Sequence, residues 1–192
     1  RNIKKILENL DIARIPLKKL VNTITAPSKV KKNEYCTVGK IPIIDQGMNF
    51  IAGYTDKNFA AVKSDEYVIF GDHSEHIKYV NFSFIQGADG LKILKARFDN
   101  TKYLYYTFVN FYKKEQNYKR HWLSAKETLI PIPYPENRIK SLEIQKEIVS
   151  ILDKLRSLQR SLQRSLQLVK NSIHFIENTC FVLMKWKLRE RH

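Results

Sequence analysis

Apolar residues follow two different patterns along this chain, and the change falls near residue 136. Before it, short apolar runs at 40–44, 67–70 and 91–94 alternate with segments rich in Gly, Asn and Asp, which is typical of strands joined by turns. Residues 103–111 are apolar and aromatic on several sides and predict a buried helix. Because of its three prolines, the segment 129–135 is expected to be an extended exit strand or linker.

After residue 136 the pattern becomes that of one long helix. Residues 141–188 contain neither Gly nor Pro, and their apolar positions are spaced alternately four and three apart, with one pair of consecutive fours. This is a heptad seam. Ser141 is expected to cap the first turn, with Glu143 near the positive end of the helix dipole. The seam comprises Ile144, Ile148, Ile151, Leu155, Leu158, Leu162, Leu166, Val169, Ile173, Ile176, Cys180 and Leu183.

Such a helix would be about 70 Å long. It is too long to bury its stripe against a domain of roughly 130 residues, so we expect it to pair with a second helix; the alternative is that it lies on its own domain. The sequence therefore predicts an α+β fold, with a mixed α/β globular domain over 1–135 and a long C-terminal coiled-coil helix in 136–192. The expected pairing residues are Ile148, Ile151, Leu155, Leu158, Leu162, Leu166, Val169, Ile173, Ile176 and Leu183.

The two consecutive fours fall within a repeat of Ser-Leu-Gln-Arg over residues 157–167. A four-residue insertion is a stutter, which locally unwinds a supercoil. It turns a helix by about 400°, a net rotation of about 40°, and lengthens it by about 6 Å. That rotation is close to the roughly 34–36° between neighbouring base pairs in DNA.

Net charge narrows the class of partner. The chain has 34 Lys and Arg against 19 Asp and Glu, a net charge of +15, and residues 1–135 alone have a net charge of +9. This excess favours a nucleic acid as partner over an anionic membrane. No apolar stretch is long enough to span a bilayer, and we expect no signal peptide. Cys36 and Cys180 predict neither a disulfide framework nor a zinc site, and we expect a reducing cytoplasm.

Sequence signatures of catalysis are few. No two glycines have the Walker or dinucleotide-binding spacing, and Pro131–Tyr134 lacks the Asn or Asp of an amino-methyltransferase motif. We therefore expect no cofactor and no catalytic residue. Asp72, His73 and His76 form the one cluster that could act on a substrate or metal. We favour a turn in which Asp72 caps the N–H groups that follow it, and keep an enzyme site there as an alternative.

Four motifs, in order, resemble the specificity subunits of type I restriction-modification systems. Ile-Pro-Ile-Ile-Asp-Gln-Gly at 41–47, followed by Gly53-Tyr54, is similar to the first strand and loop of their target-recognition domains. Gly-Asp-His-Ser at 71–74 resembles their Gly-Asp-His-Thr turn, and Gly-Ala-Asp-Gly at 87–90 resembles the turn after it. Residues 129–133 and 143–153 are similar to the passage into the family's long helix, although 134–140 lengthens the junction.

The resemblance implies a sequence-specific DNA-binding subunit without catalysis of its own. In this family methyltransferase subunits, which bind S-adenosylmethionine, dock on the specificity subunit, and a restriction subunit joins for cleavage. Complete subunits have two recognition domains and two antiparallel helices, whereas this chain has one of each. We hypothesise a homodimer through the helix that reads a symmetric two-part target, with the Ser-Leu-Gln-Arg repeats setting the spacer. The alternative is a coiled-coil adaptor with a basic surface.

Three segments contain the candidate DNA contacts. The lysines near residue 30 suit phosphate contacts, and the segment after residue 112 combines basic side chains with amides and an arginine that can read adenine and guanine. The third is the loop over 45–57. A solvated loop, a charged helix end and simple turns are the respective alternatives. The candidate contacts are Lys29, Lys31, Lys32, Gln46, Asn49, Tyr54, Lys113, Lys114, Gln116, Asn117, Lys119 and Arg120.

Overall fold

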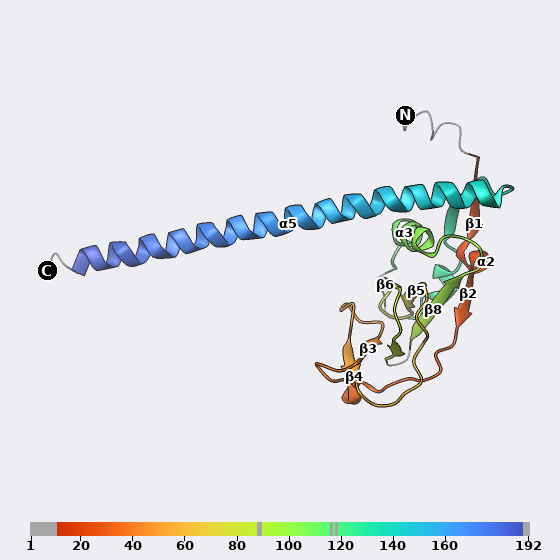
Figure 1. Ribbon diagram of the computed structural model, residues 1–192, viewed down its shortest axis with the longest axis horizontal. Helices are drawn as coiled ribbons and strands as arrows, with labels where there is room; N and C mark the ends of the chain where they lie inside the picture. The colour runs from red at the N-terminus through yellow and green to blue at the C-terminus, as the bar shows by residue number, and fades with distance from the viewer. Residues whose placement is uncertain (1–10, 88–89, 116, 118, 190–192) are drawn as a thin grey trace. The chain divides into compact units, whose positions relative to one another are not determined.

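The chain divides into two compact units, residues 1–149 and residues 150–192. The computed structural model describes the backbone of residues 11–87, 90–115, 117 and 119–189, and the side chains up to residue 172 (Figure 1). The division falls inside the long helix α5 (Arg138–Arg189), so the first turns of this helix belong to the first unit.

A four-stranded antiparallel sheet forms the middle of the first unit. Its order is β2-β8-β5-β6, and Val68 of β5 lies opposite Leu94 of β8. All five residues of β5 are buried, because successive side chains point to opposite faces of the sheet and both faces are covered. The strands predicted at 67–70 and 91–94 are thereby confirmed. The strands are β2 (Val21–Ile24), β8 (Leu91–Ala96), β5 (Tyr67–Gly71) and β6 (Ile77–Val80).

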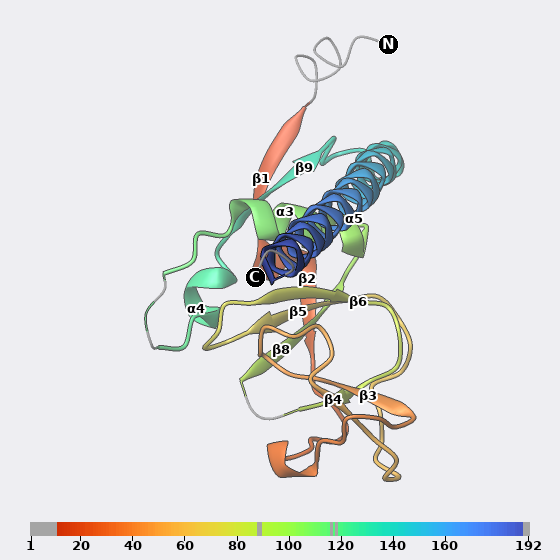
Figure 2. The same ribbon diagram turned by 90° about the vertical axis from the view of Figure 1, so that its left-hand side faces the viewer.

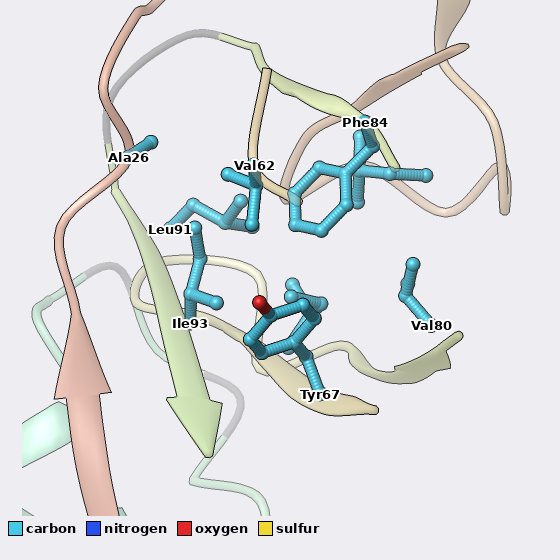
Figure 3. Close-up of a cluster of buried hydrophobic side chains, with 9 residues drawn as sticks. Ala26, Val62, Tyr67, Val80, Phe84, Leu91 and Ile93 are labelled. Carbon is cyan, nitrogen blue, oxygen red and sulfur yellow. The ribbon is translucent and has the colours of Figure 1, made fainter. Parts of the chain in front are cut away.

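A smaller sheet covers one face of the first. Its order is β4-β3-β7, with β3 antiparallel to β4 and parallel to β7, and the strand predicted at 40–44 is confirmed as β3. Between the sheets Tyr67 and Ile93 meet Ile44 and Phe84, and the Tyr67 and Phe84 rings lie 6.1 Å apart (Figure 3). The strands are β3 (Ile41–Ile44), β4 (Gly53–Thr55) and β7 (Ile85–Gln86).

Helix α3 (Thr101–Phe111) covers the opposite face of β5, which confirms the buried helix predicted at 103–111. Asn100 caps it, since its side chain accepts a hydrogen bond from the Tyr103 N–H at 2.8 Å. Phe108 is fully buried, with its ring centre 5.6 Å from that of Phe70 in β5. The central sheet is therefore covered by a helix on one face and a second sheet on the other.

The first and last strands of the domain in sequence, β1 (Ile12–Pro16) and β9 (Leu129–Pro133), pair as an antiparallel two-stranded ribbon. They lie side by side in Figure 2. The expected extended segment at 129–135 is confirmed by β9. Tyr103 joins the ribbon to α3, because its hydroxyl donates to the Pro131 carbonyl at 2.6 Å. The short helices are α2 (Leu17–Leu20), η1 (Lys32–Glu34) and α4 (Trp122–Ala125).

Helix α5 begins earlier than the sequence predicted. It starts at Arg138, and the Asn137 side chain accepts a hydrogen bond from the Lys140 N–H at 3.1 Å. The prediction that Ser141 caps the helix is wrong: Ser141 is the fourth residue of the helix and is buried. Asn137 precedes the helix by one residue and is among the best N-cap residues, so it takes this role.

The first turns of α5 are attached to the domain by a polar side chain. Gln145 is fully buried; its oxygen accepts from the Asn100 N–H at 2.9 Å. Its amide nitrogen donates to Asp99 at 2.8 Å and to the Ser141 hydroxyl at 3.1 Å. All three bonds satisfy a group that would otherwise be costly to bury. They also connect α5 directly to the N-cap of α3.

In the second unit the helix continues to Arg189. Its described seam residues are exposed, and Ile148, in the first unit, is half-buried. Ile173, Ile176 and Leu183 lie outside the residues whose side chains are described. No helix in the described part of the chain is long and apolar enough to cross a membrane. The exposed seam side chains are Ile151, Leu155, Leu158, Leu162, Leu166 and Val169.

We predict that Tyr103→Phe makes stability less dependent on alkaline pH. Burial, assisted by the Asp99 carboxylate, raises the pKa of Tyr103 to about 12. The unfolded phenol ionises near its usual pKa of about 10, so between about pH 10 and 12 the unfolded state loses the proton first. The free energy of unfolding should therefore fall with pH in this window, and Tyr103→Phe should reduce that fall.

At neutral pH the same substitution should cost about 1–2 kcal/mol, because the Pro131 carbonyl loses its donor. Urea denaturation across the pH series measures both effects. Tyr134→Phe, at a half-buried position outside the ribbon, is the control. An identical pH profile for Tyr103→Phe and the native protein would show that the phenol does not titrate differently on unfolding.

Candidate nucleic-acid interface

The turn between β5 and β6, residues 72–76, contacts two of the three candidate DNA-binding segments, and we call it the anchor turn. It contains Asp72 and Glu75, which are 5% and 3% exposed. Glu75 has a φ of 55°, a left-handed conformation that few non-glycine residues adopt. Two buried carboxylates in one turn require partners, and these come from residues distant in the sequence.

The first contact is with Gln46. The Gln46 side-chain oxygen accepts from the His73 N–H at 3.1 Å, and its main-chain carbonyl accepts from the Ser74 hydroxyl. Gly90 completes the fit: its φ is 89°, and a Cβ there would lie 2.9 Å from the Gln46 amide nitrogen. The side-chain oxygen of this predicted DNA contact is thus engaged by the anchor turn.

Lys78 of β6 holds the loop that follows Gln46. Its side chain is 6% exposed, and its ammonium group donates to the carbonyls of Asp45 and Asn49 at 2.8 and 2.6 Å. Burial lowers the pKa of Lys78, and the Asp45 carboxylate at 3.9 Å opposes that shift. The loop backbone is therefore fixed from inside, while the side chains of Met48, Asn49 and Phe50 are exposed.

The second contact is with the segment 112–122, which joins α3 to α4. Glu75 accepts from the Tyr112 hydroxyl at 2.6 Å and from the Glu115 N–H at 2.8 Å. Burial and the Glu75 carboxylate raise the pKa of Tyr112. The Asp72 carbonyl accepts from the His121 N–H, and its carboxylate from the Trp122 N–H, both at 2.8 Å. Both ends of this segment are therefore held by the same turn.

The expectation for Asp72 needs correction. Its carboxylate caps the N-terminus of α4, fifty residues further along the chain, rather than the N–H groups of its own turn. The physical reason is that the β5–β6 turn places the Asp72 carboxylate within hydrogen-bonding distance of the Trp122 N–H. Trp122 is the first residue of α4, so its N–H has no partner inside the helix. Among the described residues no group of three His, Cys, Asp or Glu side chains is arranged to hold a metal ion.

Most of the candidate contacts in 112–122 face solvent. Lys113, Lys114, Asn117, Lys119 and Arg120 are exposed. Lys119 forms an ion pair with Glu115, four residues earlier in the segment. Gln116 lies outside the described residues.

The other candidate contacts differ in exposure. Lys29, Lys31 and Lys32 are exposed, next to the buried Val30 and at the start of η1. Tyr54 is half-buried in β4, and its backbone pairs with that of Cys36. Figures 1 and 2 place β3 and β4 at the end of the domain away from β1.

Sequence reasoning missed Glu75, Lys78 and His121. His121 is fully buried, with Nε2 2.8 Å from the Asn117 carbonyl and 3.6 Å from Glu75. Lys78 was detectable, because it lies two residues before Val80 and therefore on the same inward face of β6. Glu75 and His121 offered no comparable signal, since their partners are distant in sequence.

Comparisons with known proteins bear on the family and the fold of the chain. No family model matches the sequence. The specificity subunit of the type I restriction enzymes EcoR124I and EcoR124II from Escherichia coli is 33% identical over 166 residues, which cover 81% of this chain and 41% of that protein. The chain thus spans about two fifths of the length of this curated relative.

Two solved structures share the fold. The S subunit of a type I restriction-modification system from M. genitalium superposes with a TM-score of 0.58 at 14% identity, covering 78% of this chain and 40% of that one. The HsdS subunit from Thermoanaerobacter tengcongensis gives 0.51 at 17% identity, covering 81% and 39%. The fold shared with these two structures is a mixed α/β domain followed by a long helix. The chain belongs to the specificity-subunit family of type I restriction-modification systems.

We predict that Lys78→Met destabilises the domain by about 1–3 kcal/mol, because the carbonyls of Asp45 and Asn49 lose their donor. Chemical denaturation measures the loss, and Lys63→Met, at an exposed position, is the matched control. Equal stability of the two variants would show that Lys78 does not hold the loop.

Proposed function

We propose that this chain is the sequence-reading, non-catalytic DNA-binding module of a type I restriction-modification system. The observation that carries the proposal is the exposed basic segment 112–122, fixed at both ends by buried acidic residues, on a domain with a net charge of +9. A basic segment held at both ends suits duplex DNA, because cationic side chains meet phosphates while amide and guanidinium groups reach base edges. Kinship with the E. coli specificity subunit supports the same role.

The contacts divide by chemistry. Lys29, Lys31 and Lys32 are proposed to bind phosphates, since their ammonium groups are exposed point charges. In the segment 112–122, Lys113 and Lys114 would add phosphate contacts, and the remaining amide, lysine and arginine side chains would read bases. Asn49 and the half-buried Tyr54 are the proposed contacts of the smaller sheet; Gln46 would act there mainly by shaping the loop.

Partner subunits would supply the chemistry. We propose that methylation and cleavage reside in methyltransferase and restriction subunits that assemble on this chain in the cytoplasm, and that the chain itself uses no cofactor. In this proposal residues 1–135 form the DNA-recognition domain. Residues 136–192 form a helix that spaces the two halves of the target and docks the partner subunits.

The helix is the proposed dimer interface. Six described seam residues between Ile151 and Val169 are exposed, with 46–66% of each residue accessible, and a continuous apolar stripe of this length is stable only when covered. We propose that two copies pair antiparallel through it and read a symmetric two-part target. The Ser-Leu-Gln-Arg repeats over 157–167 would then set the spacer between the halves.

Binding to duplex DNA should weaken steeply with salt. We predict that replacing Lys113 and Lys114 with Gln lowers affinity for a random-sequence duplex and makes the slope of log K against log salt shallower by about 0.9 for each phosphate that is no longer neutralised. Fluorescence anisotropy over a salt series measures this slope. Lys63→Gln is the control, and an unchanged slope in the double variant would exclude phosphate contacts by these two lysines.

The chain should be a dimer of twice 22.7 kDa in solution. We predict that Leu162→Asp gives a monomer, because it places a charge in the centre of the seam, whereas Gln163→Asp, at an exposed neighbouring position, leaves the dimer intact. Light scattering with size exclusion gives the masses. A native chain that is monomeric at all concentrations would refute pairing through the helix.

A further inference from the structure

The anchor turn joins two segments that otherwise have little in common. The loop 45–50 belongs to the smaller sheet, and the segment 112–122 connects two helices. Both carry proposed DNA contacts, so any role of the anchor turn in recognition rests on the proposed function. A single turn that binds both segments also sets the position of one relative to the other.

On the side of the loop, the anchor turn bonds to Gln46. His73 donates its N–H to the Gln46 side chain, and Ser74 donates its hydroxyl to the Gln46 carbonyl. These bonds fix the backbone at the first turn of the loop. Lys78, two residues after the anchor turn, fixes it again at Asn49. The outward side chains, with Met48 82% exposed, are left available for a ligand.

On the side of the basic segment, the bonds are to main-chain N–H groups and one hydroxyl. Glu75 binds Tyr112 and the Glu115 N–H near the start, and Asp72 binds the N–H groups of His121 and Trp122 at the end. The exposed cationic side chains lie between these two points. The two anchored ends of the segment therefore have a defined position relative to the loop 45–50.

Glu75 is an energetically unfavourable residue for a simple turn. Its carboxylate is buried and its φ of 55° is a strained conformation for a side chain with a Cβ. Gly or Asn would connect β5 to β6 with less strain. The hydrogen bonds from the Tyr112 hydroxyl and the Glu115 N–H offset this cost. One oxygen of the carboxylate accepts both, and its charge makes them stronger than bonds to a neutral amide would be.

We propose that Glu75 is a positioning residue for sequence recognition: it fixes the segment 112–122 in register with the loop 45–50, so that both segments read one half-site at a set spacing. Glu75 itself touches no DNA in this arrangement. Loss of its carboxylate should loosen the segment and weaken the preference for particular bases at the positions that the segment reads. The electrostatic part of the affinity should remain, because every exposed lysine and arginine is retained.

The structural half is tested by limited proteolysis with trypsin. The segment contains cleavage sites at Lys113, Lys114, Lys119 and Arg120. The amide oxygen of Glu75→Gln can still accept these hydrogen bonds, but they lose the charge that strengthens them. Cleavage within 113–120 should therefore accelerate about tenfold, with the rest of the domain still folded by circular dichroism. Glu136→Gln, at an exposed glutamate, is the matched control and should cut like the native chain.

Tyr112→Phe provides a second variant in case Glu75→Gln does not fold. It removes one of the two bonds and leaves the carboxylate in place, so cleavage should accelerate by a smaller factor, about threefold. Cleavage rates that match the native chain in every folded variant would overturn the inference, because Glu75 would then not hold the segment.

The functional half is tested by selecting bound sequences from a random duplex library with the full chain. The native chain and Glu136→Gln should enrich the same half-site. Glu75→Gln should lose base preference at a contiguous subset of its positions, keep it at the others, and retain the native salt dependence of binding.

The remaining outcomes separate the two ideas. Faster cleavage of Glu75→Gln with every base preference unchanged would overturn the role in specificity, but it would not contradict the proposed DNA-binding function. Uniform loss of preference together with loss of the folded domain in Glu75→Gln, with native preferences in Tyr112→Phe, would assign Glu75 a structural role alone. No enriched sequence with the native chain would overturn the proposed function, and with it the role in specificity, whatever the cleavage rates.

Discussion

Burial of charge is the constraint on which the recognition end of this domain depends. Asp72, Glu75 and Lys78 lie close together in the sequence, and each is at most 6% exposed. A buried charge is tolerated only when hydrogen bonds replace its water, and here the partners are supplied by segments 29 to 50 residues away. The requirement to pair these charges therefore orders the two loops that carry the exposed amide and cationic side chains. A purely apolar turn would leave both loops to be placed by weaker, non-directional packing.

The same principle operates where α5 leaves the domain. Gln145 bonds to Asp99, Asn100 and Ser141 within the first unit, so the start of the helix is attached by directional amide contacts. The seam residues from Ile151 to Val169 are exposed, so they do not contribute to this attachment. A helix that is anchored by polar groups and leaves its apolar stripe exposed is suited to binding another helix, which is the arrangement proposed for two copies of this chain.

Local patterns accounted for the elements and the class of protein. The runs at 67–70 and 91–94 became the two central strands, and the aromatic segment at 103–111 became the buried helix α3. Four ordered motifs pointed to the specificity-subunit family, and the relative from E. coli agrees with them. The errors concern capping: Asn137 rather than Ser141 caps α5, and Asp72 caps α4 instead of its own turn. Both roles depend on which N–H group lies within reach, and residue type alone does not decide that.

By itself the sequence determined what is periodic or additive: the strands and helices, the heptad seam, the basic charge and the family. Periodicity records which face of an element is apolar, and net charge is a sum, so neither requires knowledge of the fold. Only the tertiary structure decided that Glu75 meets Tyr112 and Glu115, and that Gln46 is engaged by the anchor turn. These contacts join residues far apart in the chain, and a hydrogen bond forms only where the folded backbone brings donor and acceptor within about 3 Å in the right direction.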